Sequence, residues 1–353
     1  MKTQKLAAIL GVAALALGAC GGKDKSGGGK GDYTACLVSD SGGWDDKSFN
    51  QSAKEGLDKA VKDLGVKSKT AESKTDSDFT RNVEGMVGEN CNLVMGVGFK
   101  LSDAISASAK DNADINYSLV DSTFKKNLDN ERALVFNTHE AAYLAGYAAA
   151  ANSKTGKVGT FGGVQLPTVT IFMDGFADGV ARYNKDKGAN VQLIGWDKAS
   201  QKGLFAETFE DKAKGTQIAE QLIQQGADVI MPVAGPVGQG TLSSVRQKND
   251  AGGTNAVIWV DSDGYTSSGD GSIIMTSVVK EIGNSVFDTV KNASEGRFSS
   301  EPYIGTLKNN GVAAAPFHDF DSRVPAPVKA RLEELRGQII DGSLDVSTPY
   351  DPS

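Results

Sequence analysis

The sequence predicts an α/β protein built from two doubly wound lobes. Short apolar runs of five to seven residues, rich in Val, Ile and Leu, alternate with longer amphipathic segments from residue 34 onward. Such alternation is typical of parallel sheets covered by helices on both faces. It continues over about 320 residues, which is more than one sheet accommodates, so two lobes are expected. A TIM barrel is the competing fold, but it requires a more regular eightfold repeat.

The apolar runs give the expected strands, and the amphipathic segments give the expected helices. Strands are expected at 34–40, 92–98, 115–120, 133–137, 157–162, 190–196, 228–234 and 256–261. Helices are expected at 49–63, 78–88, 101–111, 139–152, 168–184, 211–226, 238–249, 277–294 and 326–340. The first four strands belong to the first lobe and the last four to the second.

The N-terminal residues have the pattern of a secretory signal. Two lysines precede an apolar run at 6–17, and small residues follow it. This run is too short to be a membrane span with its own loops. The quartet LGAC that ends at Cys20 resembles the lipobox of bacterial lipoproteins, in which the Cys receives a diacylglyceryl group. We therefore expect a signal peptide at 1–19, a lipidated Cys20 with a flexible tether at 20–32, and a protein anchored by lipid on the extracytoplasmic face of the cell membrane.

Charge and the counts of Cys and His exclude some classes of partner. The formal net charge is −7 with no basic stripe, so no nucleic-acid partner is expected. His139 and His318 are far apart and join no cysteine cluster, so neither a metal nor another cofactor is expected. Thr138, beside the first of them, is expected to cap a helix. Cys36 and Cys91 form either a disulfide or two buried thiols, because sequence cannot give their separation.

The motifs of common enzymes are absent from the sequence. The segments GGVQLP and AGPVGQG match neither GxxxxGK[ST] nor GxGxxG, so no phosphate-binding loop is expected. No nucleophile elbow appears, and no Ser or Cys has an obvious His partner. A nucleoside hydrolase binds calcium through clustered acids near its N-terminus, whereas DSGGWDD spaces its acids differently. Asp45 and Asp46 are then expected as solvated turn residues that favour the dipole of the following helix. These observations favour a binding protein over an enzyme.

Acidic and small residues gather where the expected strands end. Asp40, Gly98 and Asp121 follow or end strands of the first lobe, and Gly235 and Asp261 do so in the second. In open α/β sheets, ligands lie outside the carboxyl ends of the strands. Because each lobe supplies some of these ends, we expect a ligand in a cleft between the lobes that closes around it.

The residue types in these segments suit an uncharged polar ligand with a flat face. An aromatic ring such as Phe49 or Phe209 can stack on a ring of the ligand. A carboxylate such as Asp121 or Asp261 can accept two hydrogen bonds from hydroxyls or ring N–H groups. Glycines at the strand ends let backbone amides approach the ligand closely.

The segment SDSGGWDDKSFNQSAKEGL at 39–57 resembles the opening motif of basic membrane protein (BMP) family lipoproteins. Further matches are HEAAYLAGYAAA, VGTFGG, TFEDKAKGTQIAEQLIQQGADVIMPVAGPVGQG, WVDSDGY and TSVVKEIGNSVFDTV, and together they run from about residue 34 to 316. Members of this family are substrate-binding lipoproteins of ABC transporters. The resemblance therefore implies the type I periplasmic-binding fold, a three-segment hinge, and a monomer that delivers a small molecule to an ABC permease.

The resemblance also implies where the lobes begin and end. Hinge crossings are expected near 137–139, 262–266 and 296–304. The first lobe would then comprise 33–137 and about 264–300, the second 138–263 and about 301–325, and a C-terminal helix and tail would occupy 326–353.

The resemblance implies that two aromatic residues and an acid contact the purine base of a nucleoside ligand. In the family's purine-nucleoside receptors two Phe side chains sandwich the base, and the matching residues here are Phe49 and Phe209. An Asp that meets the edge of the base corresponds to Asp121. The resemblance thus implies a purine nucleoside as the ligand.

The sugar of the nucleoside is expected to meet a second group of residues. Ribose hydroxyls are held in the family by a Lys and an Asp, which correspond to Lys280 and to either Asp261 or Asp263. An amide of Gly235 is expected at the sugar. The full set expected to bind the ligand is Asp40, Phe49, Asn50, Gly98, Asp121, Phe209, Gly235, Asp261, Asp263 and Lys280.

Three other functions fit part of the sequence. A sugar-binding lipoprotein of the same fold would not need two opposed aromatic rings. A nucleoside-cleaving enzyme needs a metal or a general acid that the sequence does not reveal. A surface antigen would explain the lipid anchor but not the residues at the strand ends.

Overall fold

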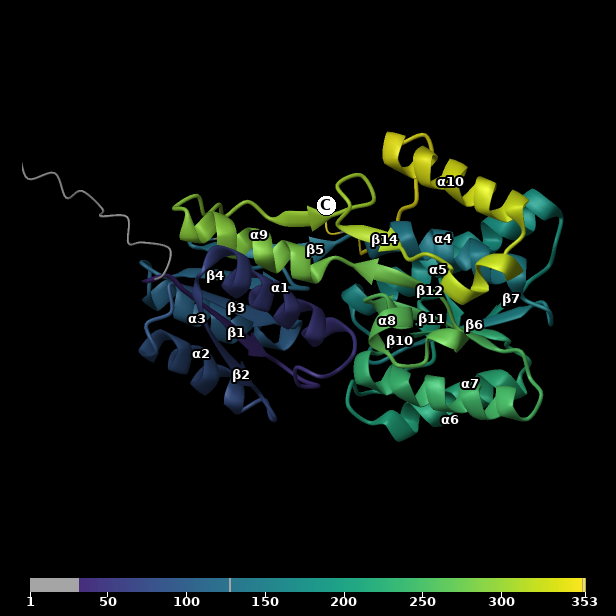
Figure 1. The fold of residues 1–353 in the computed structure, drawn as a ribbon, viewed down its shortest axis with the longest axis horizontal. Coiled ribbons are helices and arrows are strands. Elements are labelled where there is room, and N and C mark those ends of the chain that lie inside the picture. The colour runs from purple at the N-terminus through teal and green to yellow at the C-terminus, as the bar shows by residue number, and fades with distance from the viewer. Residues whose placement is uncertain (1–31, 127, 351, 353) are drawn as a thin grey trace, which may run out of the picture.

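The computed structural model consists of two α/β lobes that lie side by side along the long axis of the molecule (Figure 1). It describes residues 32–126, 128–350 and 352. The expected signal peptide at 1–19, Cys20 and nearly all of the tether at 20–32 lie outside the described residues. Among the described helices, none is both long enough and apolar enough to cross a membrane.

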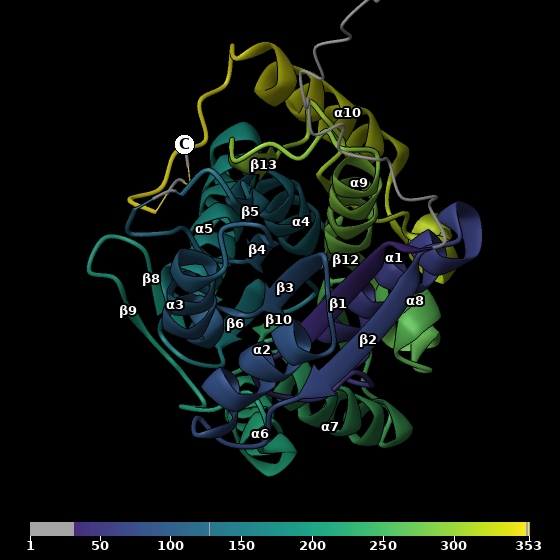
Figure 2. The same ribbon diagram turned by 90° about the vertical axis from the view of Figure 1, so that its left-hand side faces the viewer.

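Lobe 1 contains a six-stranded sheet in which every neighbouring pair of strands is parallel. The strand order is β13-β5-β4-β3-β1-β2. The strands are β1 (Thr34–Ser39), β2 (Lys67–Glu72), β3 (Leu93–Val97), β4 (Asn116–Val120), β5 (Glu131–Phe136) and β13 (Tyr303–Gly305). Helices α1 (Phe49–Leu64) and α9 (Ile282–Ser294) pack together on one face of this sheet, and α2 (Asp78–Gly88) and α3 (Ser102–Asp111) cover the other. Figure 2 views the molecule with this lobe in front.

Lobe 2 contains a second six-stranded sheet, with the order β14-β12-β11-β10-β6-β7. All its strands are parallel except β14, which pairs with β12 in the antiparallel direction. The strands are β6 (Lys157–Gly162), β7 (Gln192–Ile194), β10 (Val229–Val233), β11 (Ala256–Asp261), β12 (Ile274–Lys280) and β14 (Val312–Ala314). Lobe 2 also contains a two-stranded antiparallel ribbon, formed by β8 (Trp196–Asp197) and β9 (Lys202–Gly203), and the short helix α8 (Gly264–Ser267).

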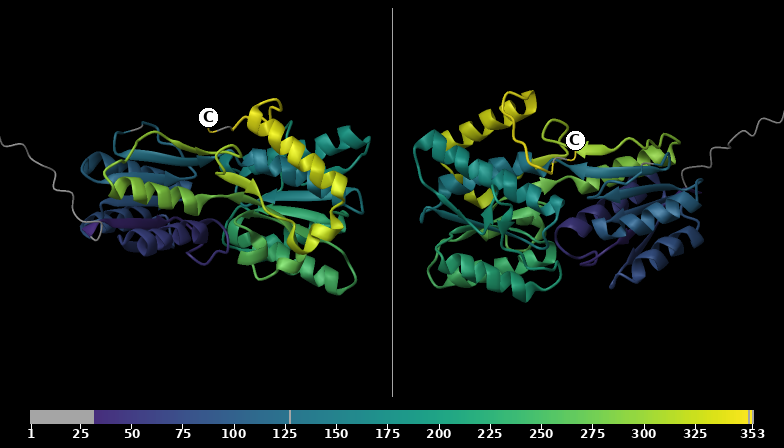
Figure 3. Two further views of the ribbon diagram at one scale, coloured as in Figure 1. Left: turned by 45° about the horizontal axis from the view of Figure 1, so that its top comes forward. Right: turned by 180° about the vertical axis from the view of Figure 1, so that it is seen from behind.

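The helices of lobe 2 cover both faces of its sheet. Helices α4 (Thr138–Asn152) and α5 (Pro167–Lys187) lie on one face, and α6 (Lys212–Gln224) and α7 (Gly238–Asp250) lie on the other. Helix α4 is apolar around its whole circumference, which is typical of a fully buried helix, and the C-terminal helix α10 (Ala326–Asp341) packs against it from outside. Figure 3 shows α10 on the outer side of lobe 2. The architecture confirms the predicted α/β fold with two doubly wound lobes.

The chain passes between the lobes three times, and two of the three expected crossings are wrong. The first crossing follows β5, as expected near 137–139, because β5 belongs to the first sheet and α4 packs in lobe 2. The second does not lie near 262–266, because β12 is still paired with β11. The chain leaves lobe 2 only between β12 and α9, and it returns between β13 and β14 rather than at 296–304. The strand β12 thus belongs to lobe 2 and β13 to lobe 1, opposite to the expected boundaries.

The short strands β9, β13 and β14 have no counterpart in the sequence-based prediction, and β12 and β2 differ from it for identifiable reasons. The prediction of one helix over 277–294 is wrong, because β12 ends at Lys280 and the helix begins only at Ile282. The run IIMTSVVK consists mostly of apolar and β-branched residues, so it fits a buried strand of a parallel sheet. Strand β2 was not predicted at all, because its sequence KSKTAE is polar. It lies at the edge of the sheet and is mostly exposed there.

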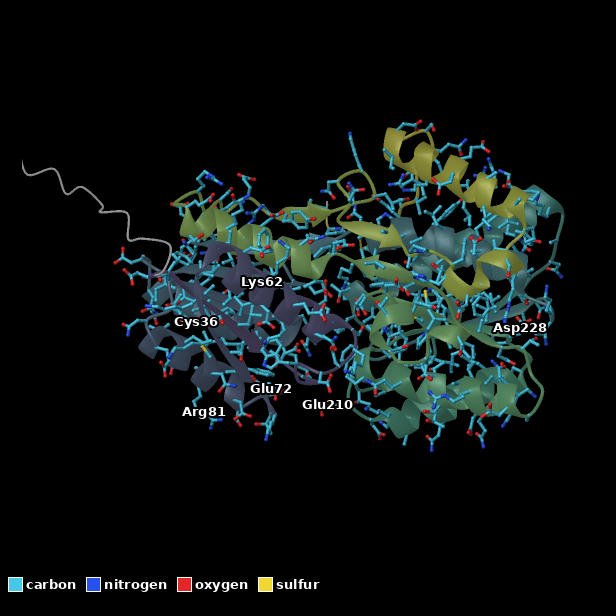
Figure 4. The ribbon with its side chains drawn as sticks, in the orientation of Figure 1. Cys36, Lys62, Glu72, Arg81, Glu210 and Asp228 are labelled. Atoms are coloured by element: carbon cyan, nitrogen blue, oxygen red, sulfur yellow. A yellow bond between two sulfur atoms is a disulfide. The ribbon has the colours of Figure 1, made fainter. Side chains whose placement is uncertain are left out.

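Cys36 and Cys91 form a disulfide, so the alternative of two free thiols does not hold. Their Cα atoms are 6.1 Å apart, within the range that a disulfide spans. Cys36 lies on β1, and Cys91 lies two residues before the paired strand β3. The side chain of Cys36 is directed into lobe 1 (Figure 4). The disulfide therefore links two neighbouring segments beneath α2 and α3.

Candidate ligand-binding site

Nine of the ten predicted ligand-binding residues line one cavity between the lobes. The cavity has a volume of about 80 Å³ and lies where strand ends of both sheets face each other. These nine residues are Asp40, Phe49, Asn50, Gly98, Asp121, Phe209, Gly235, Asp261 and Lys280. The carboxyl ends of parallel strands thus converge on a cleft, as the sequence predicts.

The first wall of the cavity is formed where β1 and β3 end. Asp40 follows β1, and its backbone N–H donates to the carbonyl of Val97 at the end of β3. Its carboxylate accepts hydrogen bonds from the backbone N–H groups of Ser41 at 2.5 Å and Lys100 at 3.4 Å. Gly98 has a φ of +108°, and a Cβ atom there would lie 2.0 Å from Oδ2 of Asp40. Only glycine therefore leaves room for the carboxylate at this strand end.

Asp46 organises the beginning of α1, which carries Phe49 and Asn50 into the cavity. The carboxylate of Asp46 accepts hydrogen bonds from the backbone N–H groups of Ser48, Asn50 and Gln51, at 3.0, 2.8 and 3.0 Å. These are donors that a helix start leaves without partners, and a side chain that caps them stabilises the helix by about 1 kcal/mol. Asp46 is 2 % exposed, so the expectation that it is a solvated turn residue is wrong.

Asn50 offers an unused hydrogen-bonding atom inside the cavity. Its side-chain Nδ2 donates to the carbonyl of Ser41 at 2.6 Å. Its Oδ1 is buried and has no hydrogen-bond partner among the described residues. Because a buried acceptor without a partner costs free energy, this oxygen fits a site that receives an N–H or O–H donor from a ligand.

Lys280 connects the two lobes inside the cavity. It ends β12 of lobe 2, and its Nζ donates to Oδ2 of Asp121, after β4 of lobe 1, at 2.7 Å. The same Nζ lies 3.5 Å from Oδ1 of Asp261 at the end of β11. The side chain of Lys280 is 3 % exposed, and its ammonium lies 5.2 Å from the centre of the Phe49 ring and 5.1 Å from that of Phe172. Two carboxylates and aromatic faces thus surround one buried cation.

The buried charges of the cavity have shifted pKa values. Burial raises the pKa of Asp40 to about 6 and that of Asp46 to about 6, despite the hydrogen bonds that favour their ionised forms. Burial also raises the pKa of Asp121, although Lys280 opposes this shift. For Lys280 burial acts to lower the pKa, but the charges of Asp121 and Asp261 outweigh it and hold the pKa above its usual value. Lys280 therefore remains a cation beside an excess of carboxylates.

Lobe 2 contributes apolar surface and an accessible backbone. The Phe209 ring packs on Gly163, where a Cβ atom would lie 2.4 Å from its Cε1. Gly235, after β10, has a φ of +52° and open space around the position of a Cβ atom. Phe172, on the second turn of α5, lies beside them in the cavity wall. No signal in the sequence marks Phe172 as a site residue, because it lies within a helix rather than at a strand end.

Asp263 is the predicted site residue that the structure does not bring to the cavity. Its Oδ2 lies 2.7 Å from Nε2 of His318, and its Oδ1 accepts the backbone N–H of Tyr265 at the start of α8. Of the two acids that the sequence left as alternatives, Asp261 lines the cavity and Asp263 does not.

A loop of lobe 1 is bound to lobe 2 beside the cavity. Lys47 has a φ of +64°, and its carbonyl accepts hydrogen bonds from Trp259 Nε1, Ser262 Oγ and Ser267 Oγ at 3.2, 3.0 and 3.1 Å. The next residue, Ser48, has its Oγ 2.9 Å from Oδ2 of Asp261. We call Lys47, Ser48, Trp259, Ser262 and Ser267 the interlobe clasp. Its bonds join the two lobes and orient Asp261.

A neighbouring pocket shares Asp46 and Pro236 with the ligand cavity, and four acidic residues and two lysines of the described part of the chain line it. Glu72 of lobe 1 and Glu210 of lobe 2 line it, together with Asp45, and Figure 4 shows the two labelled glutamates on neighbouring sides of the junction between the lobes. The backbone N–H of Trp44 donates to Glu72 at 2.8 Å. Within the described part of the chain, no group of three or more His, Cys, Asp or Glu residues is arranged to hold a metal ion.

Comparison with known proteins agrees with the fold. The family described as ABC transporter substrate-binding protein PnrA-like, called Bmp, matches residues 34–342. The chain is 33% identical over 332 residues to the ABC transporter nucleoside-binding protein BmpA of Lactococcus lactis subsp. cremoris, with 90% of each chain covered. It is 32% identical to the CD4+ T-cell-stimulating antigen of Listeria innocua, over 95% of each chain.

A solved structure shares the whole two-lobed fold. The ABC transporter system solute-binding protein of Aeropyrum pernix K1 superposes with a TM-score of 0.82 at 24% identity, over 91% of this chain and 94% of that one. These findings confirm the resemblance seen in the sequence motifs, and they describe proteins that bind substrates for transport rather than enzymes. The chain belongs to the Bmp family of PnrA-like ABC transporter substrate-binding proteins.

Proposed function

We propose that this protein captures a purine nucleoside in the cleft between its lobes and presents it to an ABC permease. Phe49 and Phe209 sandwich the base, and Asp121 accepts hydrogen bonds from its edge. Asp261, Lys280 and the backbone of Gly235 bind the ribose hydroxyls. A diacylglyceryl group on Cys20 holds the protein on the extracytoplasmic face of the cell membrane, where it acts as a monomer.

The observation that carries this proposal is the convergence of residues from both lobes on one cavity. Among the described residues, four Phe side chains, Phe49 and Phe209 among them, line it with four carboxylates and one lysine. The carboxylates and the lysine provide acceptors and donors for a ligand without net charge. The unpartnered oxygen of Asn50 supplies a further acceptor. The relative in Lactococcus lactis, described as nucleoside-binding, supports the same class of ligand.

Closure of the cleft accompanies binding in this proposal. Lys280 and Asp121 come from different lobes, as do Ser48 and Asp261. A ligand shifts a hinge equilibrium only through contacts that it gains in the closed form. A nucleoside that touches both Phe49 and Phe209 gains such contacts, and each stacked ring contributes roughly 1–3 kcal/mol by analogy with stacking in other nucleic-acid sites.

Isothermal titration calorimetry with the chain that begins at Asp32 tests the ligand. This chain contains both sheets and all their helices. Adenosine, guanosine, inosine, the free bases, ribose and arabinose are each titrated, and each mixture is sampled for released base. We expect at least one purine nucleoside to bind with no product formed, and the bases and pentoses to bind far more weakly. Binding of a pentose alone would favour a sugar-binding protein, and release of a base would favour an enzyme.

A further inference from the structure

A second chamber adjoins the ligand cavity near the first crossing between the lobes, where Val135, Phe136 and Thr138 line it, and it has a volume of about 470 Å³. It shares five lining residues with the ligand cavity, which are Phe99, Asp121, Leu166, Thr168 and Lys280. The two spaces are therefore neighbours that meet at the ion pair of Lys280 and Asp121. Phe49, Phe209, Gly235 and Asp261 line only the first of them.

The chamber wall is balanced in charge and rich in hydroxyl groups. Asp121 and Lys280 are the charged residues among the described residues that line it, and they pair with each other at 2.7 Å. No unpaired cation is therefore available there for a phosphate. Hydroxyls come from five lining residues, Ser122, Thr123, Thr138, Thr168 and Tyr350. Apolar side chains such as Val135, Phe136 and Ile171 form the rest.

Thr138 gives the chamber an unsatisfied polar group. It is 0 % exposed, and its Oγ1 has no hydrogen-bond partner among the described residues. The expectation that this hydroxyl caps α4 is wrong, because Thr138 is already the first residue of the helix and makes no cap bond. A buried hydroxyl without a partner indicates a place for a ligand group or an ordered water.

The C-terminal tail forms the outer wall of the chamber. Tyr350 and Pro352 line it. The tail is held to lobe 2 through Val346, which is 7 % exposed, and through the carbonyl of Ser347, which accepts a hydrogen bond from Nζ of Lys198 at 2.9 Å. The chamber is thus bordered by segments that are far apart in sequence and that come from both lobes.

We propose that this chamber is a second subsite that receives an uncharged, polar substituent of the bound nucleoside. This inference rests on the proposed function and extends it from the nucleoside core to its derivatives. The protein would then take up nucleosides that are extended at the sugar or at the base, and would reject nucleotides. Thr138 supplies a hydroxyl to the substituent, and the tail at Tyr350 limits its length.

The test compares parent nucleosides with extended forms by calorimetry. Adenosine, guanosine and inosine are each titrated beside a 5′-N-ethylcarboxamide form, a form with a 2-hydroxyethyl group on the base, and the 5′-monophosphate. We expect at least one uncharged extended form to bind within tenfold of its parent, and the monophosphate to bind at least a hundredfold more weakly. If every uncharged extended form binds more than tenfold more weakly than its parent, the subsite proposal is overturned while the proposed function stands. If no parent nucleoside binds, both are overturned.

Three variants test whether the accepted extended form enters this chamber. Thr123→Trp fills the chamber from an exposed position. It should raise the Kd of the extended form at least tenfold and leave the Kd of the parent nucleoside within twofold of the wild-type value. Lys126→Trp, an exposed neighbour that does not line the chamber, is the matched control and should change neither. Thr138→Val should weaken the extended form about fivefold, the factor that corresponds to about 1 kcal/mol for one hydrogen bond. Truncation after Thr348 removes Tyr350 and Pro352 from the chamber wall. The Kd of the extended form should therefore change, while the Kd of the parent nucleoside stays the same.

These variants also separate the subsite from a merely structural role. Thr138→Val removes a hydroxyl that has no partner, so the thermal midpoint of the ligand-free protein should not fall. Equal effects of Thr123→Trp on parent and extended nucleosides would show that the chamber does not hold the substituent, and would overturn the proposal.

Discussion

Lys280 of lobe 2 donates a hydrogen bond to Asp121 of lobe 1 at 2.7 Å, so one buried ion pair spans the cleft. The sequence motifs assigned these two residues to different ends of the ligand. Their direct contact means instead that the Lys280 ammonium contacts the cavity walls of both lobes. A ligand must therefore bind beside this ion pair or displace it. The pair therefore links the two lobes directly at the candidate ligand site.

Replacement Lys280→Met should weaken both ligand binding and the fold. Loss of hydrogen bonds from a charged donor costs about 1.5–3 kcal/mol, which corresponds to a rise in Kd of roughly 10- to 150-fold. Asp121 would be left buried without its cation, so the free energy of unfolding at pH 7 should fall by about 3 kcal/mol. Calorimetric titration and urea denaturation measure the two effects.

The double variant Lys280→Met/Asp121→Asn is the control for this prediction. With the lone charge removed, it should recover part of the lost stability but none of the affinity. Losses that simply add in the double variant would mean that the two residues do not act as a pair.

The interlobe clasp should slow release of the ligand. Replacements Ser262→Ala and Ser267→Ala together remove two donors to the carbonyl of Lys47. Because these bonds join the two lobes, their loss should destabilise the closed form relative to the open form. We expect the dissociation rate to rise about 5- to 30-fold, for about 1–2 kcal/mol lost from two bonds. Stopped-flow measurements give the rate.

The matched control for the clasp is Ser268→Ala. The hydroxyl of Ser268, the residue after α8, donates to the carbonyl of Gly264 and accepts the backbone N–H of Asp270, and neither bond reaches lobe 1. It should leave the dissociation rate unchanged, and a rate raised equally by both sets of replacements would point to damage of α8 rather than loss of the clasp.

Asp40 should make the stability of the protein depend on pH. Its pKa in the folded protein is about 6, above the ordinary 3.8 of an Asp, because it is buried. Between these values the folded state binds more protons than the unfolded chain, so this group's contribution to stability rises as the pH falls from about 6 to about 4. Asp40→Asn removes this titration and keeps the shape of the side chain.

The measurement for Asp40 is the difference between the unfolding free energies of the wild type and Asp40→Asn at each pH. That difference should shift in favour of the wild type as the pH is lowered through this window, and it should stay constant above about pH 7. A difference that is independent of pH would show that Asp40 titrates normally in the folded protein.

The disulfide of Cys36 and Cys91 should contribute strongly to the stability of lobe 1. It closes a loop with a sequence separation of 55 residues, for which the loss of chain entropy predicts about 4 kcal/mol. The paired replacement Cys36→Ala/Cys91→Ala should lower the unfolding free energy by up to this amount while ligand affinity is retained, since neither residue lines the cavity. Equal loss of affinity would link the disulfide to the site.

Much of the site could be predicted because it lies at strand ends. Apolar runs reveal where buried parallel strands end, and the acids and glycines that follow them were therefore visible in the sequence, as for Asp40 and Asp121. The motif WVDSDGY could not distinguish Asp261 from Asp263, because the backbone turns sharply there, with a φ of +67° at Asp261. Phe172 and Asp46 were missed as site residues, since their positions depend on packing between distant segments.

The hinge could not be located from the sequence for a similar reason. Which sheet a strand joins depends on hydrogen bonds between segments far apart in the chain, and β12 and β13 carry no local signal of their lobe. Strand β2 has no apolar pattern, because an exposed edge strand buries little.

The affinity of the Phe209→Ala variant for a purine nucleoside tests most directly whether two lobes grip a flat ring between aromatic side chains. Phe209 packs on Gly163 at the cavity and is only partly buried. Calorimetry should give a Kd raised roughly 5- to 150-fold, for about 1–3 kcal/mol of lost stacking, with the thermal midpoint of the ligand-free protein little changed. An unchanged Kd together with a lowered thermal midpoint would make Phe209 part of the core and contradict the proposed grip.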